Sequence, residues 1–96
     1  MRPYELMYLV QPTADEERLG AISERIQQAI TAAGGKIEKV VPIGRRRLAY
    51  RVSRFREGLY TVVDFQLNPQ SAREVDRTIK LQEEILRHII TRRDIA

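Results

Sequence analysis

Hydrophobic and polar positions follow first the period of a strand and then the period of a helix. Residues 4–10 (YELMYLV) are apolar at every second position and mostly apolar in between, which predicts a strand buried on both faces and therefore central in its sheet. Residues 13–16 (TADE) have the spacing of a capping box, and apolar residues then recur every three or four positions to Ala33. This pattern predicts a long amphipathic helix that ends at Gly34-Gly35.

The middle of the chain again has the period of strands. Residues 36–52 alternate on both sides of an interruption at Pro42 and Gly44. Because proline cannot donate to a sheet ladder, we expect a bent or bulged strand at an edge of the sheet. A loop is predicted over residues 53–58 and a third strand over residues 59–67. One face of this third strand is formed by Leu59, Thr61, Val63, Phe65 and Leu67.

A second helix and a last strand complete the chain. Asn68-Pro69 predicts a helix start, with a hydrogen bond from Ser71 within its first turn, and the helix is expected to end near Lys80. Residues 85–90 predict a strand and residues 91–96 a short polar tail. The order β-α-β-β-α-β predicts one α+β domain over residues 1–96. We expect the ferredoxin-like arrangement, a four-stranded antiparallel sheet with two helices on one face.

Composition excludes most classes of catalytic and metal site. The chain has 96 residues, no cysteine and one histidine, His88, so thiol chemistry, disulfides and a histidine metal cage are ruled out. No nucleotide-binding, zinc-protease or serine-hydrolase motif occurs. We therefore expect no enzyme, no cofactor, no metal and no small-molecule substrate. Without a leader segment or a bilayer-length apolar run, the protein is expected to be cytoplasmic and free of membranes.

Charge is distributed unevenly along the chain. The net charge is only +4, but the segment 45–56 contains six arginines and no acidic residue, while both predicted helices are slightly acidic. These six residues are Arg45, Arg46, Arg47, Arg51, Arg54 and Arg56. Arginine grips phosphate with two parallel hydrogen bonds and stacks on bases, which favours RNA as a partner. The alternative is that the charges only protect a sheet edge from aggregation, although the absence of acids favours an anionic partner.

Aromatic residues argue against base stacking on the open face of the sheet. The third strand lacks the aromatic signature of an RNA recognition motif. We expect most of the rings to pack in the core or on the sheet. The rings are Tyr4, Tyr8, Tyr50, Tyr60, Phe55 and Phe65.

Residues 44–52 (GRRRLAYRV) resemble the signature of the sixth protein of the bacterial small ribosomal subunit. That signature is a glycine, any residue, a basic residue, a polar or charged residue, Leu-Ala-Tyr, any residue and isoleucine, for which Val52 stands here. Further matches to the family lie along nearly the whole chain. They are Arg2-x-Tyr4-Glu5, Gly34-Gly35 before Val40, Glu57-Gly58 and Asp76-Arg77.

The resemblance implies a structural protein of the small-subunit platform in the cytoplasmic ribosome. It implies binding to the central domain of small-subunit ribosomal RNA together with the eighteenth small-subunit protein. Carried over from the family, the RNA contacts are Arg2, Arg87, Arg92 and Arg93, with His88 as a further candidate. The second strand and its neighbourhood would meet the partner protein or RNA. The residues expected there are Arg45, Arg46, Arg47, Tyr50, Arg51, Arg54 and Arg56.

Two other classes of protein share the predicted fold. A hydrolase of the acylphosphatase type would need an anion-cradling loop after the first strand, and residues 10–15 (VQPTAD) offer proline and an acid instead. A metabolite-binding regulatory module would oligomerise through its sheet edges. Pro42 and the arginines of the second strand argue against such self-pairing, but not against a different partner.

Overall fold

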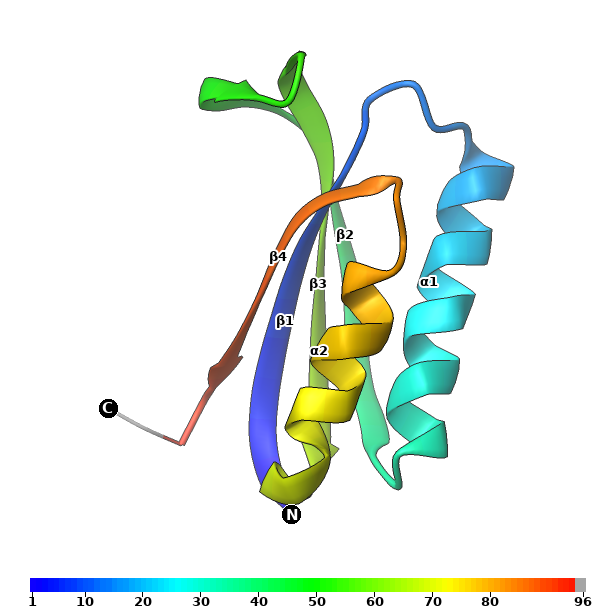
Figure 1. Cartoon of the computed structure of the whole chain (residues 1–96), viewed down its shortest axis with the longest axis vertical. Helices are drawn as coiled ribbons and strands as arrows, with labels where there is room; N and C mark the ends of the chain where they lie inside the picture. The colour runs from blue at the N-terminus through cyan, green and yellow to red at the C-terminus, as the bar shows by residue number, and fades with distance from the viewer. Residues whose placement is uncertain (95–96) are drawn as a thin grey trace.

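Four strands and two helices follow one another in the predicted order in the computed structural model, which describes residues 1–94 (Figure 1). The elements are β1 (Arg2–Val10), α1 (Glu16–Ala32), β2 (Lys36–Val52), β3 (Phe55–Leu67), the 3-10 turn η1 (Pro69–Ser71), α2 (Ala72–Lys80) and β4 (Ile85–Arg92). All strand pairs are antiparallel, in the order β2-β3-β1-β4. Both helices cover one face of the sheet and leave the other face open. This is the predicted ferredoxin-like α+β fold.

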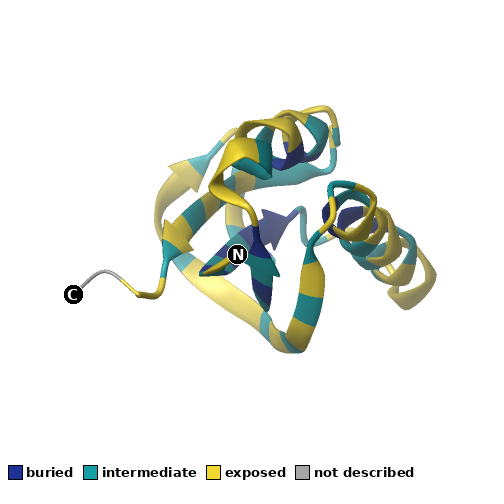
Figure 2. Cartoon of the chain, turned by 90° about the horizontal axis from the view of Figure 1, so that it is seen from below, coloured by how far each residue is buried: buried dark blue, intermediate teal, exposed yellow. Residues whose placement is uncertain are grey.

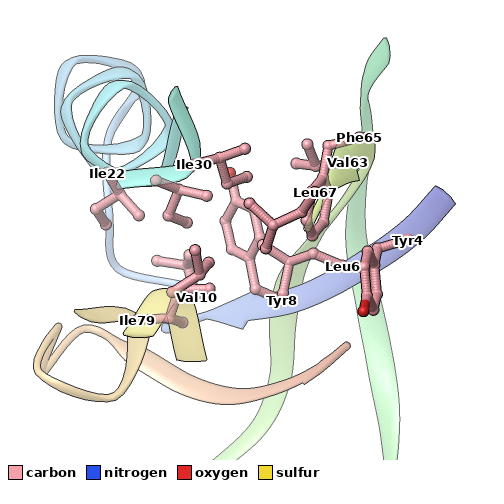
Figure 3. Packing of buried hydrophobic residues seen from close by; sticks show 12 residues of the cluster. Tyr4, Leu6, Tyr8, Val10, Ile22, Ile30, Val63, Phe65, Leu67 and Ile79 are labelled. Atoms are coloured by element: carbon pink, nitrogen blue, oxygen red, sulfur yellow. The ribbon is translucent and has the colours of Figure 1, made fainter. Parts of the chain in front are cut away.

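The hydrophobic core lies between the sheet and the two helices (Figures 2 and 3). β1 occupies a central position, as predicted, and its even-numbered residues point into the core because side chains alternate along a strand. Tyr4 stacks on Phe65 of β3, with ring centroids 5.6 Å apart and an angle of 17° between the planes. The buried side chains of this cluster are Tyr4, Leu6, Tyr8, Val10, Ile22, Ile26, Ile30, Val63, Phe65, Leu67, Val75 and Ile79, and Leu9 is buried outside it.

The ends of α1 show one wrong prediction and one confirmed prediction. The N-cap is Asp15, whose carboxylate accepts a 2.8 Å hydrogen bond from the Arg18 backbone N–H, so the capping box that begins at Thr13 is not formed. Aspartate also places a negative charge at the positive end of the helix dipole. At the other end Gly34 adopts the left-handed conformation (φ 87°), which confirms the predicted glycine stop.

The hairpin between β2 and β3 is longer than predicted. β2 is an edge strand, and its pairing with β3 shifts between Pro42 and Gly44, which confirms the predicted irregularity. The loop predicted over residues 53–58 is wrong, because Val52 pairs with Phe55 and leaves a two-residue turn. Ser53 supplies the positive φ, 56°, that such a tight hairpin turn requires.

The start of α2 and the end of β4 also differ from the prediction. The chain turns first through η1 at Pro69, and α2 begins three residues later. Neither Asn68 nor Ser71 makes a side-chain capping hydrogen bond, so the predicted bond from Ser71 is absent within residues 1–94. β4 extends two residues into the predicted tail because Arg92 pairs with Tyr4, and residues 95–96 of that tail lie outside the described residues.

Candidate nucleic-acid and protein interface

Two of the predicted RNA-binding arginines meet around one carboxylate where β1 begins and β4 ends. The guanidinium of Arg92 donates to both oxygens of Asp94, at 3.1 and 3.0 Å, and Arg2 lies 3.7 Å from the same carboxylate. The hydrogen bond from Arg92 lowers the pKa of Asp94 and raises the pKa of Arg92. Two positive charges against one negative charge leave this group of three side chains net positive.

Arg93 is held by carboxylates on the open face of the sheet. Its guanidinium lies 2.6 Å from Glu38 of β2 and 3.9 Å from Asp64 of β3, and its backbone N–H donates to the Pro3 carbonyl. One oxygen of Asp64 is buried and has no hydrogen-bond partner within residues 1–94. The charge of Arg93 is therefore largely compensated inside the molecule.

Arg87 and His88 are neighbours in sequence but lie on opposite faces of β4, because strand side chains alternate. Arg87 projects from the open face, where its guanidinium carbon lies 5.4 Å from the ring centroid of Tyr50 on β2. His88 faces the helices and contacts Asp76 of α2 at 2.6 Å, with only 11% of its side chain exposed. This hydrogen bond is the main cause of a lowered pKa at Asp76.

The five predicted RNA-binding residues do not form one continuous patch. Arg2 and Arg92 lie together, Arg93 and Arg87 reach over the open face at separate places, and His88 is turned towards α2. The sequence shows that these residues are basic, but it does not show which face of the sheet each side chain lies on.

The tip of the β2–β3 hairpin, residues 45–58, is called the arm here; it extends beyond the helices (Figure 1). All six of its arginines are exposed. Arg45 pairs with Glu57 at 2.5 Å, Arg46 donates to the Arg45 carbonyl, and Arg54 lies over the Phe55 ring. The other three, Arg47, Arg51 and Arg56, form no ion pair with any residue in 1–94.

An apolar groove of about 340 Å³ lies between the arm and the open face of the sheet. Tyr50 and Ile89 are 64% and 58% exposed there, and Tyr50 lies against Arg87 of β4 rather than in the core. Of the residues that line the groove, the sequence pointed to Tyr50, Arg87 and His88 but not to Ile89 or the remaining apolar ones, although apolar positions on both faces of residues 4–10 are a signal for them. The apolar side chains that line the groove include Met7, Leu9, Leu48, Tyr50, Val52, Tyr60 and Ile89.

No group of three or more histidine, cysteine or acidic residues within residues 1–94 is placed to hold a metal ion. Neither helix in that range is long and apolar enough to cross a membrane. What the arrangement offers is an apolar groove beside exposed guanidinium groups, which suits binding to a protein and a polyanion.

Comparison with known proteins decides the family. The sequence profile described as "Ribosomal protein S6" matches residues 3–92. The chain belongs to the ribosomal protein S6 family. This confirms the resemblance found at residues 44–52, and the protein is therefore a non-enzymatic, structural component of the small subunit of the cytoplasmic ribosome.

Several relatives match the chain over almost its full length. Small ribosomal subunit protein bS6 of an Arthrobacter species is 46% identical over 92 residues, which cover 96% of this chain and 91% of that protein. The protein of the same name from Clostridium beijerinckii is 39% identical over 95 residues, 99% of this chain and all of its own length. The crystal structure of 30S ribosomal protein S6 from Thermotoga maritima has a TM-score of 0.91 at 35% identity, over 96% of this chain and 87% of that one.

The fold also occurs outside the family. The C-terminal domain of the MgtC protein from Mycobacterium tuberculosis has a TM-score of 0.66 over 96% of this chain and 87% of that one. At 9% identity this similarity shows a shared fold alone.

Proposed function

We propose that the protein binds the central domain of small-subunit ribosomal RNA together with the eighteenth small-subunit protein during assembly of the platform. The observation that supports this most directly is the pairing of two unlike surfaces on one hairpin. An apolar groove faces the sheet, and exposed arginines lie along the same arm. A partner protein fills the groove, while guanidinium groups displace counterions from RNA phosphates.

RNA contacts at the other end of the sheet come from Arg2 and Arg92, whose charges share one carboxylate. A further contact comes from Arg87, which lies on the open face beside the arm. Arg93 contributes only when it leaves Glu38 and Asp64, and His88 only when its face of β4 opens away from α2. Few phosphates are neutralised by a protein of net charge +4, so binding by the isolated protein is weak. A partner docked beside the same RNA adds its own contacts and raises the affinity.

A salt titration of RNA affinity, with and without the partner protein, tests the proposal. The probe is a fragment of the central domain of small-subunit ribosomal RNA. We expect weak, salt-sensitive binding by the protein alone and much tighter binding when the partner is added. Equal affinity in both titrations contradicts joint binding.

The groove is tested by a pair of matched variants. Ile89→Ser removes an apolar side chain from the groove, whereas Leu81→Ser removes one that is 75% exposed and lies outside it. We expect the Ile89 variant to lose capture of the partner and the Leu81 variant to keep it, with both melting curves unchanged in shape. Equal capture by the two variants argues against the groove as the docking site.

A further inference from the structure

Positive charge is concentrated on the arm. Residues 45–58 contain six arginines and one glutamate, a net charge of +5, whereas the whole chain has +4, so the rest of the molecule is net −1. A polyanion that approaches the protein therefore experiences attraction mainly at the arm. The contact carried over from the family, at Arg2 and β4, does not account for this concentration.

The arm borders two hollows of different chemistry. Leu48, Tyr50 and Val52 line the apolar groove over the sheet. Arg47 and Arg51 line a second hollow of about 570 Å³ together with Arg56. Leu48 and Ala49 border both the groove and this hollow, whereas Arg47, Arg51 and Arg56 line the hollow alone.

The guanidinium groups of the hollow lack internal partners. Glu57 also lines the hollow, but its carboxylate is already bound by Arg45 at 2.5 Å. Within residues 1–94 Arg47, Arg51 and Arg56 form no ion pair, and all three are exposed. Their hydrogen-bond donors are free to bind a ligand from solution.

We propose that the hollow of Arg47, Arg51 and Arg56 binds the phosphodiester backbone of RNA, at a contact separate from the one made by Arg2 and β4. This inference rests on the proposed function and assigns the hollow of the three arginines to RNA rather than to the partner protein. The arm then bridges the two partners, with protein in the groove and RNA in the neighbouring hollow.

Charge favours RNA over protein as the occupant of the hollow. A protein surface would have to desolvate three guanidinium groups, which is costly unless it brings a carboxylate for each. An RNA backbone carries one charge per phosphate and leaves the contacts partly hydrated. Arginine also binds phosphate with two parallel hydrogen bonds, which explains the use of arginine at all three positions.

The test compares two double variants of equal net charge. Arg47→Ala/Arg51→Ala empties the hollow, and Arg73→Ala/Arg77→Ala removes two exposed arginines of α2 that also form no ion pair within residues 1–94. The logarithm of the affinity for the central-domain RNA fragment is measured against the logarithm of salt concentration, with the partner protein present. Each phosphate contact contributes about 0.7 to 0.9 to the slope. We expect the salt slope of the arm variant to be shallower than that of wild type by about 1.5, and the salt slope of the α2 variant to equal that of wild type.

The outcomes separate this inference from the proposed function. Replacement of both arm arginines by lysine should restore the slope, because the charge returns. If wild type binds RNA and the two alanine variants have equal slopes, the hollow is not an RNA site and the proposed function stands. If the arm variant keeps the wild-type slope but no longer captures the partner protein, the hollow belongs to the protein interface instead. A wild-type protein that fails to bind the fragment with its partner present overturns both.

Discussion

Replacement of Arg87 by alanine tests whether β4 holds the arm in place over the groove. The guanidinium carbon of Arg87 lies 5.4 Å from the Tyr50 ring centroid, and Nη1 lies 3.4 Å from the tyrosine hydroxyl. The hydrogen bond is long and adds little, so the cation–π contact dominates. Both side chains are exposed, and such contacts are worth about 0.5–1 kcal/mol. In a domain of this size that corresponds to a change of roughly 2–8 °C in Tm.

A double-mutant cycle isolates this contact from the other effects of each substitution. Unfolding by urea is measured for Arg87→Ala, Tyr50→Leu and the double variant, and we expect a coupling free energy of about 0.5–1 kcal/mol. Tyr50→Phe serves as the control because it keeps the ring and should keep most of the coupling. Additive single effects would refute the idea that Arg87 positions the arm.

The same variants show whether Arg87 also contacts RNA directly. A direct phosphate contact makes the salt slope of Arg87→Ala shallower by about 0.7 to 0.9, whereas Tyr50→Leu leaves the slope unchanged. An equal loss of affinity in both variants, without a change of slope, means that Arg87 acts only through the arm.

Four further predictions concern the scaffold. Gly35→Ala would place a Cβ 2.8 Å from a β3 carbonyl oxygen, so we expect a loss of about 1–3 kcal/mol in urea unfolding. In Gly20→Ala the new Cβ, inside α1, meets no atom within 4 Å, so we expect the protein to be stabilised by about 0.5–1 kcal/mol. A Gly35 variant more stable than the Gly20 variant would contradict both predictions. Asp15→Ala removes the N-cap and should cost about 1 kcal/mol in the same assay. The hydrogen bond from His88 lowers the pKa of Asp76, so this carboxylate stabilises the fold above its ordinary value of 3.8. Asp76→Asn should therefore destabilise at neutral pH and converge with wild type in acid; a pH-independent difference would count against the linkage.

The sequence predicts the order of elements well because burial leaves a period that survives in every element. The alternation in residues 4–10 and the three-to-four spacing up to Ala33 both follow from one face meeting the core, and the structure confirms both. The ends of a helix depend instead on single capping hydrogen bonds, which several neighbouring residues could form almost equally well. Thr13 and Asp15 are both good N-caps, and only the path of the chain after β1 selects the aspartate.

The hairpin shows a different limit. Arginines and a glycine over residues 53–58 have the composition of a loop, yet pairing between Val52 and Phe55 extends both strands into the arm. Pairing across a turn is a property of two segments, so the composition of one segment does not reveal it.

The interface depends on which face of the sheet each side chain lies on, and the pairing register of the strands determines that face. A shift of one residue in the pairing of β4 with β1 would exchange Arg87 and His88 between the open face and the helix face. The core sets this register through Ile90, which pairs with Leu6 and packs against the buried cluster. The apolar residues thereby decide which basic residues reach solvent on the open face, and which ones bind the protein's own carboxylates. Basic residues in a strand sequence can therefore be assigned to a binding surface only when the packing of the core shows which face of the sheet they lie on.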